Sequence, residues 1–208
     1  AIKGVAAAGS GDMNVDRRLE SIQKLSSTVT DPLVMYMFAA WKRDRVSCDG
    51  LLHMLADLES YLFRRMICSV SSNGLNKLVP SLIVRLDSAE DDLAETFAAL
   101  LITETAKATR MPTDSKFRQA LLGENLYRPA WRCKYLLAGM ENHNHPKDPR
   151  AFSEFTIEHI MPQNAMAHAE WCNMLADLDR FPLLANSLGN LTLTAYNSER
   201  SEERRVGK

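Results

Sequence analysis

Residues 155–164, FTIEHIMPQN, decide how the C-terminal part of the chain is interpreted. The segment opens with apolar and β-branched residues typical of a short strand, and it turns at Pro162. Glu158 and His159 stand side by side where this strand ends. Burial of such a pair is unfavourable unless both groups find partners. A reacting site is one reason for a chain to accept that cost.

Further elements are expected downstream of this segment. Residues 191–194, LTLT, alternate apolar and β-branched side chains and predict a second strand. A helix is expected around Trp171 and Leu175, and the charged residues 195–207 predict a last helix. The tail is therefore strand, long insertion, strand and helix. A hairpin packed on that helix would gather four polar side chains: Glu158, His159, Asn190 and Asn197.

These four side chains suggest a chemistry. Neighbours in a strand point to opposite faces, so Glu158 and His159 can flank one small site only at a strand end. Carboxylate and amide oxygens suit a hard cation such as Mg²⁺, which takes one or two protein ligands and keeps several waters. A nearby neutral imidazole can remove a proton from water. Together these groups fit hydrolysis of a phosphodiester, in which the metal holds the phosphate and stabilises the leaving oxygen.

Each residue also has a simpler interpretation. His159 could be a satisfied core histidine, and Asn190 a turn residue. Asn197 could be only a helix N-cap, and Glu158 could pair with an arginine instead of a metal. We favour the catalytic interpretation of His159 because Glu158, Pro162 and the segment GNLTL accompany it.

Two histidines flank an asparagine in the triplet HNH, at His143, Asn144 and His145, and histidines at this spacing could chelate a metal. They lie in the polar stretch ENHNHPKDPR, residues 141–150, which we interpret as a flexible surface loop and a domain boundary. This triplet is therefore not our candidate site. Trp171, in the insertion, is expected to pack onto the core of the tail.

The first two thirds of the chain predict helices. Asp31-Pro32 is a helix start signal, and Asp49 opens a longer segment with leucines at helical spacing. Further helices are expected after Thr113 or Asp114 and near Pro129.

Two details of the helical region are more specific. Pro80 lies inside the predicted helix at 75–86 and is expected to kink or split it. Ser88 and Asp91 resemble a capping box ahead of the helical segment LAETFAALLI.

The composition bounds the class of protein. The chain has 208 residues, 46% of them hydrophobic, enough for one large domain or two small ones. Its apolar runs are shorter than the roughly 20 residues of a membrane span, so no membrane partner is expected. Four cysteines that form no CxxC pair predict reduced thiols in a cytoplasmic protein.

The net charge of −1 excludes a generic polycation. Between residues 105 and 150, nine Lys or Arg residues oppose four acidic residues, so the local charge is +5 (9 − 4). This excess predicts either a basic surface or ordinary solvated helix faces.

Two motifs together resemble a known family. IEHIMPQ followed by LGNLTLTAYNS is similar to the HNH, or His-Me finger, nuclease domain at the C-terminus of GmrSD-type modification-dependent restriction endonucleases and related phage-defence nucleases. Two upstream stretches, YLFRRMICSVSSNGLNKLVPSL and YRPAWRCKYLLAGMEN, resemble the helical region that precedes this domain. The resemblance extends from about residue 13 onward.

The resemblance implies a role for each candidate residue. His159 would be the general base, Glu158 and Asn197 would be ligands of Mg²⁺ or Mn²⁺, and Asn190 would brace the loop that holds the histidine. The chain departs from the family near its end, where Glu202 stands in place of an expected second asparagine. Either Glu202 serves as an oxygen ligand there, or the ending is foreign sequence.

The implied fold is mainly α: a helical domain followed by a small ββα-metal (His-Me finger) module. We expect a linker or cloning remnant at residues 1–12, the helical domain at 13–145 and the nuclease module at 146–208. The Gly-rich start fits a cut from a longer protein.

The implied function is metal-dependent DNA cleavage or nicking, in bacterial defence against phage or modified foreign DNA. The partners would be DNA and an N-terminal sensor or NTPase-like region of the full-length protein. Four arginines are candidate DNA contacts: Arg128, Arg132, Arg204 and Arg205. Two alternatives stay open, a catalytically degenerate DNA-binding domain and a helical interaction module that docks a partner subunit.

Overall fold

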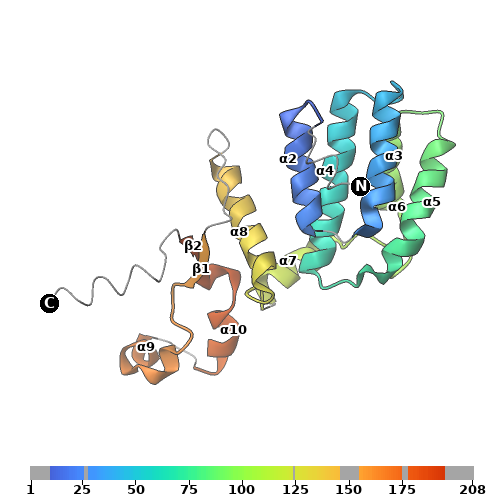
Figure 1. Cartoon of the computed structure of the whole chain (residues 1–208). Helices are drawn as coiled ribbons and strands as arrows, with labels where there is room; N and C mark the ends of the chain where they lie inside the picture. Colours follow the sequence, from blue (N-terminus) through green and yellow to red (C-terminus); the bar gives the residue numbers. More distant parts are fainter. Residues whose placement is uncertain (1–9, 26–27, 124, 146–154, 175–177, 195–208) are drawn as a thin grey trace. The chain divides into compact units, whose positions relative to one another are not determined.

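The computed structural model describes residues 10–25, 28–123, 125–145, 155–174 and 178–194. The chain forms two compact units, Ala1–Phe117 and Arg118–Lys208, which we call the helical unit and the C-terminal unit. Helices dominate the described residues, and two short strands form a small sheet (Figure 1). The expectation of a mainly α protein is confirmed.

The helical unit is an array of helices packed around α4 (Cys48–Ile67), which contacts α2, α3 and α6. Its described elements are α2 (Met13–Leu25), η1 (Thr28–Thr30), α3 (Asp31–Lys42), α4, η2 (Ser72–Gly74), α5 (Leu75–Asp87) and α6 (Leu93–Thr103). The division between the units falls within α7 (Asp114–Gly123).

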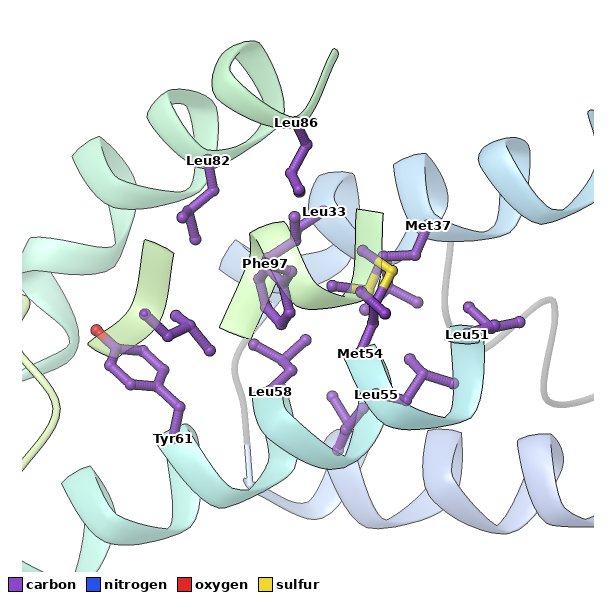
Figure 2. Packing of buried hydrophobic residues seen from close by; sticks show 14 of the residues in the cluster. Leu33, Met37, Leu51, Met54, Leu55, Leu58, Tyr61, Leu82, Leu86 and Phe97 are labelled. Carbon is purple, nitrogen blue, oxygen red and sulfur yellow. The ribbon is translucent and has the colours of Figure 1, made fainter. Parts of the chain in front are cut away.

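Apolar residues of α4 recur every three or four positions and are buried, among them Leu51, Leu55 and Leu58. They meet Leu82 and Phe97 from α5 and α6 in the interior of the helical unit (Figure 2). Burial of this continuous apolar surface is what holds the helices together, because single helices of this length are marginal in water.

The predicted helix starts are close to the observed ones. Helix α3 begins at Asp31, with Pro32 in its first turn. Helix α4 begins one residue before Asp49, and Ser47 caps it by accepting a hydrogen bond from the Gly50 backbone N–H at 3.0 Å.

Pro80 does not split the helix that contains it, because α5 runs without interruption from Leu75 to Asp87. A proline leaves the carbonyl four residues earlier without its helical donor. That carbonyl belongs to Asn76, and both Asn76 and Pro80 are exposed. Water can therefore satisfy the orphaned acceptor, and the helix continues.

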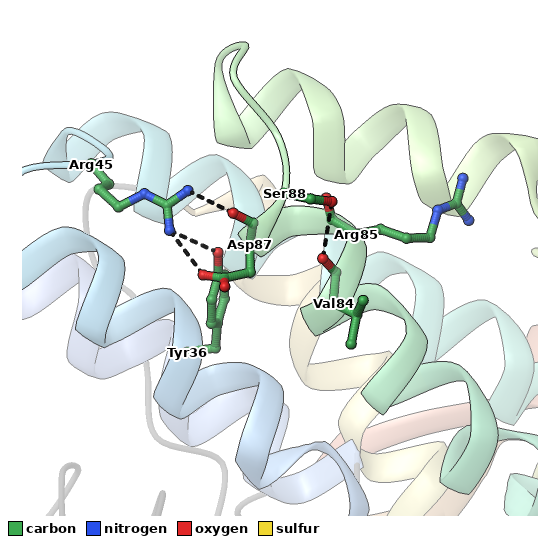
Figure 3. A network of polar contacts seen from close by, with 6 residues as sticks. All are labelled: Tyr36, Arg45, Val84, Arg85, Asp87 and Ser88. Carbon is green, nitrogen blue, oxygen red and sulfur yellow. Dashed lines mark hydrogen bonds and ion pairs between the residues drawn. The ribbon is translucent and has the colours of Figure 1, made fainter.

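The capping box predicted at Ser88 and Asp91 is wrong. Ser88 instead closes the end of α5, where its hydroxyl donates to the carbonyl oxygens of Val84 and Arg85 at 3.1 Å each (Figure 3). The N-cap of α6 is Asp92, whose Oδ1 accepts hydrogen bonds from the backbone N–H groups of Ala94 and Glu95 at 2.8 and 2.9 Å.

A surface network near the same corner ties α3 to the end of α5. Arg45 donates to the Asp87 carboxylate at 3.2 Å and to the Tyr36 hydroxyl at 3.3 Å (Figure 3). Burial raises the pKa of Tyr36 from its usual value. Since Asp87 is largely exposed, this ion pair adds little to the stability of the unit.

The C-terminal unit holds a two-stranded antiparallel sheet beside α8 (Ala130–Asn144). Strand β1 (Thr156–His159) pairs with β2 (Leu191–Thr194), so that Glu158 lies opposite Thr192 and His159 opposite Leu191. Both strands lie where the sequence predicted them. The expected last helix at 195–207 lies outside the described residues.

The long connection between the strands is built from short helical turns. Its elements are η4 (Ala165–Ala167), α9 (Ala169–Met174), η5 (Leu178–Arg180), α10 (Phe181–Ala185) and η6 (Leu188–Asn190). Met161, Ala165 and Ala185 form a small buried cluster here, and Trp171 and Phe181 pack against it. Trp171 thus packs as predicted, and α9 covers the expected insertion helix up to Met174.

The compact units divide between residues 117 and 118, whereas the sequence analysis placed the domain boundary after residue 145. The difference arises because α8 contacts both strands and falls in the C-terminal unit. In the described part of the chain, no helix has the length and apolar character needed to cross a membrane. Two of the four cysteines, Cys68 and Cys133, are buried.

Candidate active site

His159 is the last residue of β1 and is half-buried. Its Nε2 lies 3.2 Å from Oδ1 of Asn186 and 3.1 Å from the side-chain nitrogen of Gln163. A single ring nitrogen either donates or accepts, so only one of these contacts is a hydrogen bond in a given tautomer. If Nε2–H donates to Asn186, Nδ1 carries the free lone pair.

An aromatic ring fixes the imidazole from a second direction. Tyr127 meets His159 edge to face, with ring centroids 4.6 Å apart and an interplanar angle of 67°. Tyr127 follows Leu126, whose backbone N–H donates to the Asn186 carbonyl at 3.2 Å. This hydrogen bond links the segment that carries Tyr127 to Asn186, which contacts Nε2 of His159. Tyr127 and Asn186 together orient the His159 ring.

Asn190 holds the turn that follows His159. Its side chain is buried, accepts from the Met161 N–H at 2.7 Å, and donates to the Met161 and Ala185 carbonyls at 3.0 and 2.8 Å. Its own carbonyl accepts from the Ile160 N–H at 2.9 Å. One amide thus satisfies three buried backbone groups, which would otherwise lose hydrogen bonds away from water.

Glu158 is exposed, and strand alternation turns it away from the side of the sheet that His159 faces. It has no ion-pair partner among the described residues. Its carboxylate therefore remains accessible at the strand end.

The described residues around His159 offer few ligands for a metal ion. The described ranges contain no group of three His, Cys, Asp or Glu side chains that could hold an ion. Mg²⁺ needs only one or two protein ligands and completes its shell with water and phosphate. Glu158 fits one such ligand, and the second candidate, Asn197, lies outside the described residues.

Residues 111–204 match the family model for the C-terminal domain of GmrSD restriction endonucleases. In this segment, which we call the GmrSD domain, the chain is similar to those enzymes. No curated protein and no solved structure matches the chain. The match covers α8 and both strands, all of which lie in the C-terminal unit. The GmrSD domain therefore places this part of the chain in a family of nucleases, as the sequence motifs implied.

The candidate arginines of the GmrSD domain differ in their surroundings. Arg132 is buried, and its guanidinium donates to the carbonyls of Asn125 and Arg128 at 2.9 and 3.0 Å. This geometry holds the entry to α8 and favours a structural role over a phosphate contact. The Arg128 side chain is exposed. Three other candidates lie outside the described residues: Glu202, Arg204 and Arg205.

The literal HNH triplet is not a loop, which corrects the sequence interpretation. His143 and Asn144 form the last turn of α8, and His145 is its C-cap. His145 lies 3.2 Å from the Glu141 carboxylate, one helical turn earlier. The exposed end of a helix carries polar side chains, as a loop does, so the run of polar residues at 141–145 did not distinguish the two.

Sequence reasoning missed three residues that contact the His159 ring: Tyr127, Gln163 and Asn186. The sequence signal that could have indicated Gln163 and Asn186 is the number of Asn and Gln residues near the two motifs. Tyr127 lies 32 residues before His159 in sequence (159 − 127), and no local pattern connects them.

Proposed function

We propose that the GmrSD domain is a metal-dependent DNA endonuclease of the HNH type that nicks or cleaves phage or modified foreign DNA in bacterial defence. The observation that carries the proposal is the half-buried imidazole of His159, held at a strand end by an amide contact and an aromatic ring. The location of His159 within a segment that matches a restriction-endonuclease family supports this reaction over a purely structural role.

In this proposal His159 takes a proton from the attacking water. With Nε2–H donating to Asn186, Nδ1 is the base, and Tyr127 keeps the ring from rotating. Asn190 holds the turn after His159, so the ring stays fixed at the strand end. These residues supply orientation before the reaction begins.

Glu158 and Asn197 would hold Mg²⁺ or Mn²⁺. A bound cation would neutralise charge on the scissile phosphate and stabilise the leaving oxygen. Arg128, Arg204 and Arg205 are proposed to contact phosphates of the DNA. Four cysteines without a CxxC pair fit a cytoplasmic protein. A sensor region elsewhere in a longer protein would select the DNA.

A supercoiled-plasmid assay tests the proposal. Wild-type protein with Mg²⁺ or Mn²⁺ should nick the plasmid, and chelation of the metal should abolish nicking. His159→Ala should lower the nicking rate by about 10²–10⁴-fold, because it removes the general base.

His143→Ala is the matched control, since this exposed histidine lies at the end of α8 and should leave the rate unchanged. Equal nicking by His159→Ala and wild type would exclude the assigned mechanism. DNA binding without nicking by any variant would favour the degenerate DNA-binding alternative.

A further inference from the structure

A second feature of the C-terminal unit lies beside the His159 turn and has no role in the mechanism above. It is an open hollow of about 600 Å³ between η4 and α9. Six residues line it: Pro162, Ala167, His168, Ala169, Glu170 and Trp171.

Trp171 supplies the hollow with a fixed aromatic surface. The indole is half-buried, packs against the cluster of Met161, Ala165 and Ala185, and also lines the hollow. A ring supported by a packed cluster loses little conformational freedom when a flat ligand stacks on it. Nucleobases stack on such aromatic side chains whatever their sequence, because every base has a π-face.

The polar lining favours a base over a phosphate. Glu170 and His168 are exposed at the hollow, and among the residues that the structure describes no Lys or Arg lines it. A carboxylate repels a phosphate but accepts a hydrogen bond from an exocyclic amino group, as Glu and Asp do from cytosine. Two alanines, Ala167 and Ala169, also line the hollow and add little side-chain bulk to it.

The hollow is also tied to the position of His159. Pro162 lines it and stands three residues after His159, and three residues span at most about 11 Å. Met161, between them, has both of its backbone polar groups bound by Asn190. A strand whose phosphate lies at His159 would therefore carry a base within reach of the hollow.

We propose that this hollow binds one unstacked base of the DNA strand next to the scissile phosphate, with Trp171 stacking on it and Glu170 accepting from its exocyclic amino group. The inference rests on the proposed nuclease function for the identity of its ligand. It predicts a preference at one position for adenine, cytosine or guanine over thymine, which has no amino group.

The test measures binding without cleavage. All proteins carry His159→Ala, and fluorescence anisotropy with labelled single-stranded oligonucleotides gives the Kd. One set of oligonucleotides carries cytosine at each position in turn, and matched sets carry thymine or an abasic site there. An abasic site at one position should weaken binding by about ten-fold or more, as expected for loss of one stacked base.

Trp171→Ala should weaken binding of the intact strand by the same factor and abolish the abasic effect, because the two changes remove one contact. Trp171→Phe should retain most of the effect and guards against loss of packing in the small cluster. Glu170→Ala should leave the abasic effect in place and remove the preference for cytosine over thymine. Trp131→Ala, at an exposed tryptophan of α8, should change neither quantity.

The proposal would be overturned if the abasic effect were as large in the protein with Trp171→Ala and His159→Ala as in the protein with His159→Ala alone. It would also be overturned if neither Trp171→Ala nor an abasic site at any position changed binding. The outcome is separable from the plasmid assay. Coupling between Trp171 and one base, without nicking by any protein, would contradict the nuclease function and support the base site. Nicking without coupling between Trp171 and one base would support the nuclease function and contradict the base site.

Discussion

At the scale of single residues, Asn190 shows how one amide can organise a site. Its side chain accepts from the Met161 N–H and donates to the carbonyls of Met161 and Ala185, all in buried surroundings. Hydrogen bonds in such surroundings matter mainly through the cost of leaving them unmade. The turn after His159 is therefore fixed by a side chain from the far end of the insertion.

Asn190→Ala should destabilise the C-terminal unit by about 2–4 kcal/mol, because three buried backbone groups lose their partner. The direct readout is amide hydrogen exchange. The Met161 N–H, which donates to the lost Oδ1, should exchange at least about 30-fold faster, as expected for a loss of 2 kcal/mol. Asn173→Ala, at an exposed position of α9, should leave Met161 protected. Unchanged exchange at Met161 in Asn190→Ala would contradict this account.

At the scale of elements, the ends of helices depend on which polar group reaches a free amide. Ser88, Asp91 and Asp92 are close in sequence, and each is a plausible cap by residue type. The structure gives Ser88 to the end of α5 and Asp92 to the start of α6. The choice follows from where each helix axis begins, which a pattern of residue types does not specify.

Asp92→Ala should lower the stability of the helical unit by about 1 kcal/mol, the usual effect of losing an N-cap. Asp91→Ala, one residue earlier and equally exposed, should change it by less than about 0.5 kcal/mol. Urea unfolding followed by circular dichroism measures both. The assignment of the cap would be reversed if Asp91→Ala proved the more harmful change.

At the scale of the whole molecule, each unit is stabilised by its own interior. In the helical unit, Tyr61 of α4 is buried and donates its hydroxyl hydrogen bond to the carbonyl of Thr109, 48 positions later. This bond fastens the segment after α6 to the central helix. Burial raises the pKa of Tyr61 to about 12.

This raised pKa predicts how stability depends on pH. Above about pH 10 the unfolded chain releases the Tyr61 proton, while the folded chain keeps it until about pH 12, so rising pH favours unfolding across that interval. Wild type should lose up to about 2–3 kcal/mol there from this group.

Tyr61→Phe lacks the hydroxyl, and should be less stable than wild type by about 1 kcal/mol at pH 8. The difference between the two proteins should then shrink or reverse between pH 10 and pH 12. Urea unfolding of both proteins at each pH measures it. A difference that stays constant to pH 12 would show that Tyr61 does not titrate differently in the folded state.

The sequence by itself determined most of the local structure. Period and start signals located the helices, alternation located both strands, and two motifs together pointed to His159, Asn190 and a GmrSD-type domain. These features are readable because they depend on residues a few positions apart, where backbone geometry fixes which side chains share a face.

Only the tertiary structure decided which distant groups meet. It brought Tyr127 and Asn186 to the His159 ring, placed α8 beside the strands, and set Trp171 between a packed cluster and an open hollow. The physical reason is that such contacts depend on how elements pack, and packing is set by the shapes of many side chains at once. A linear pattern carries the period of each element but not its neighbours in space.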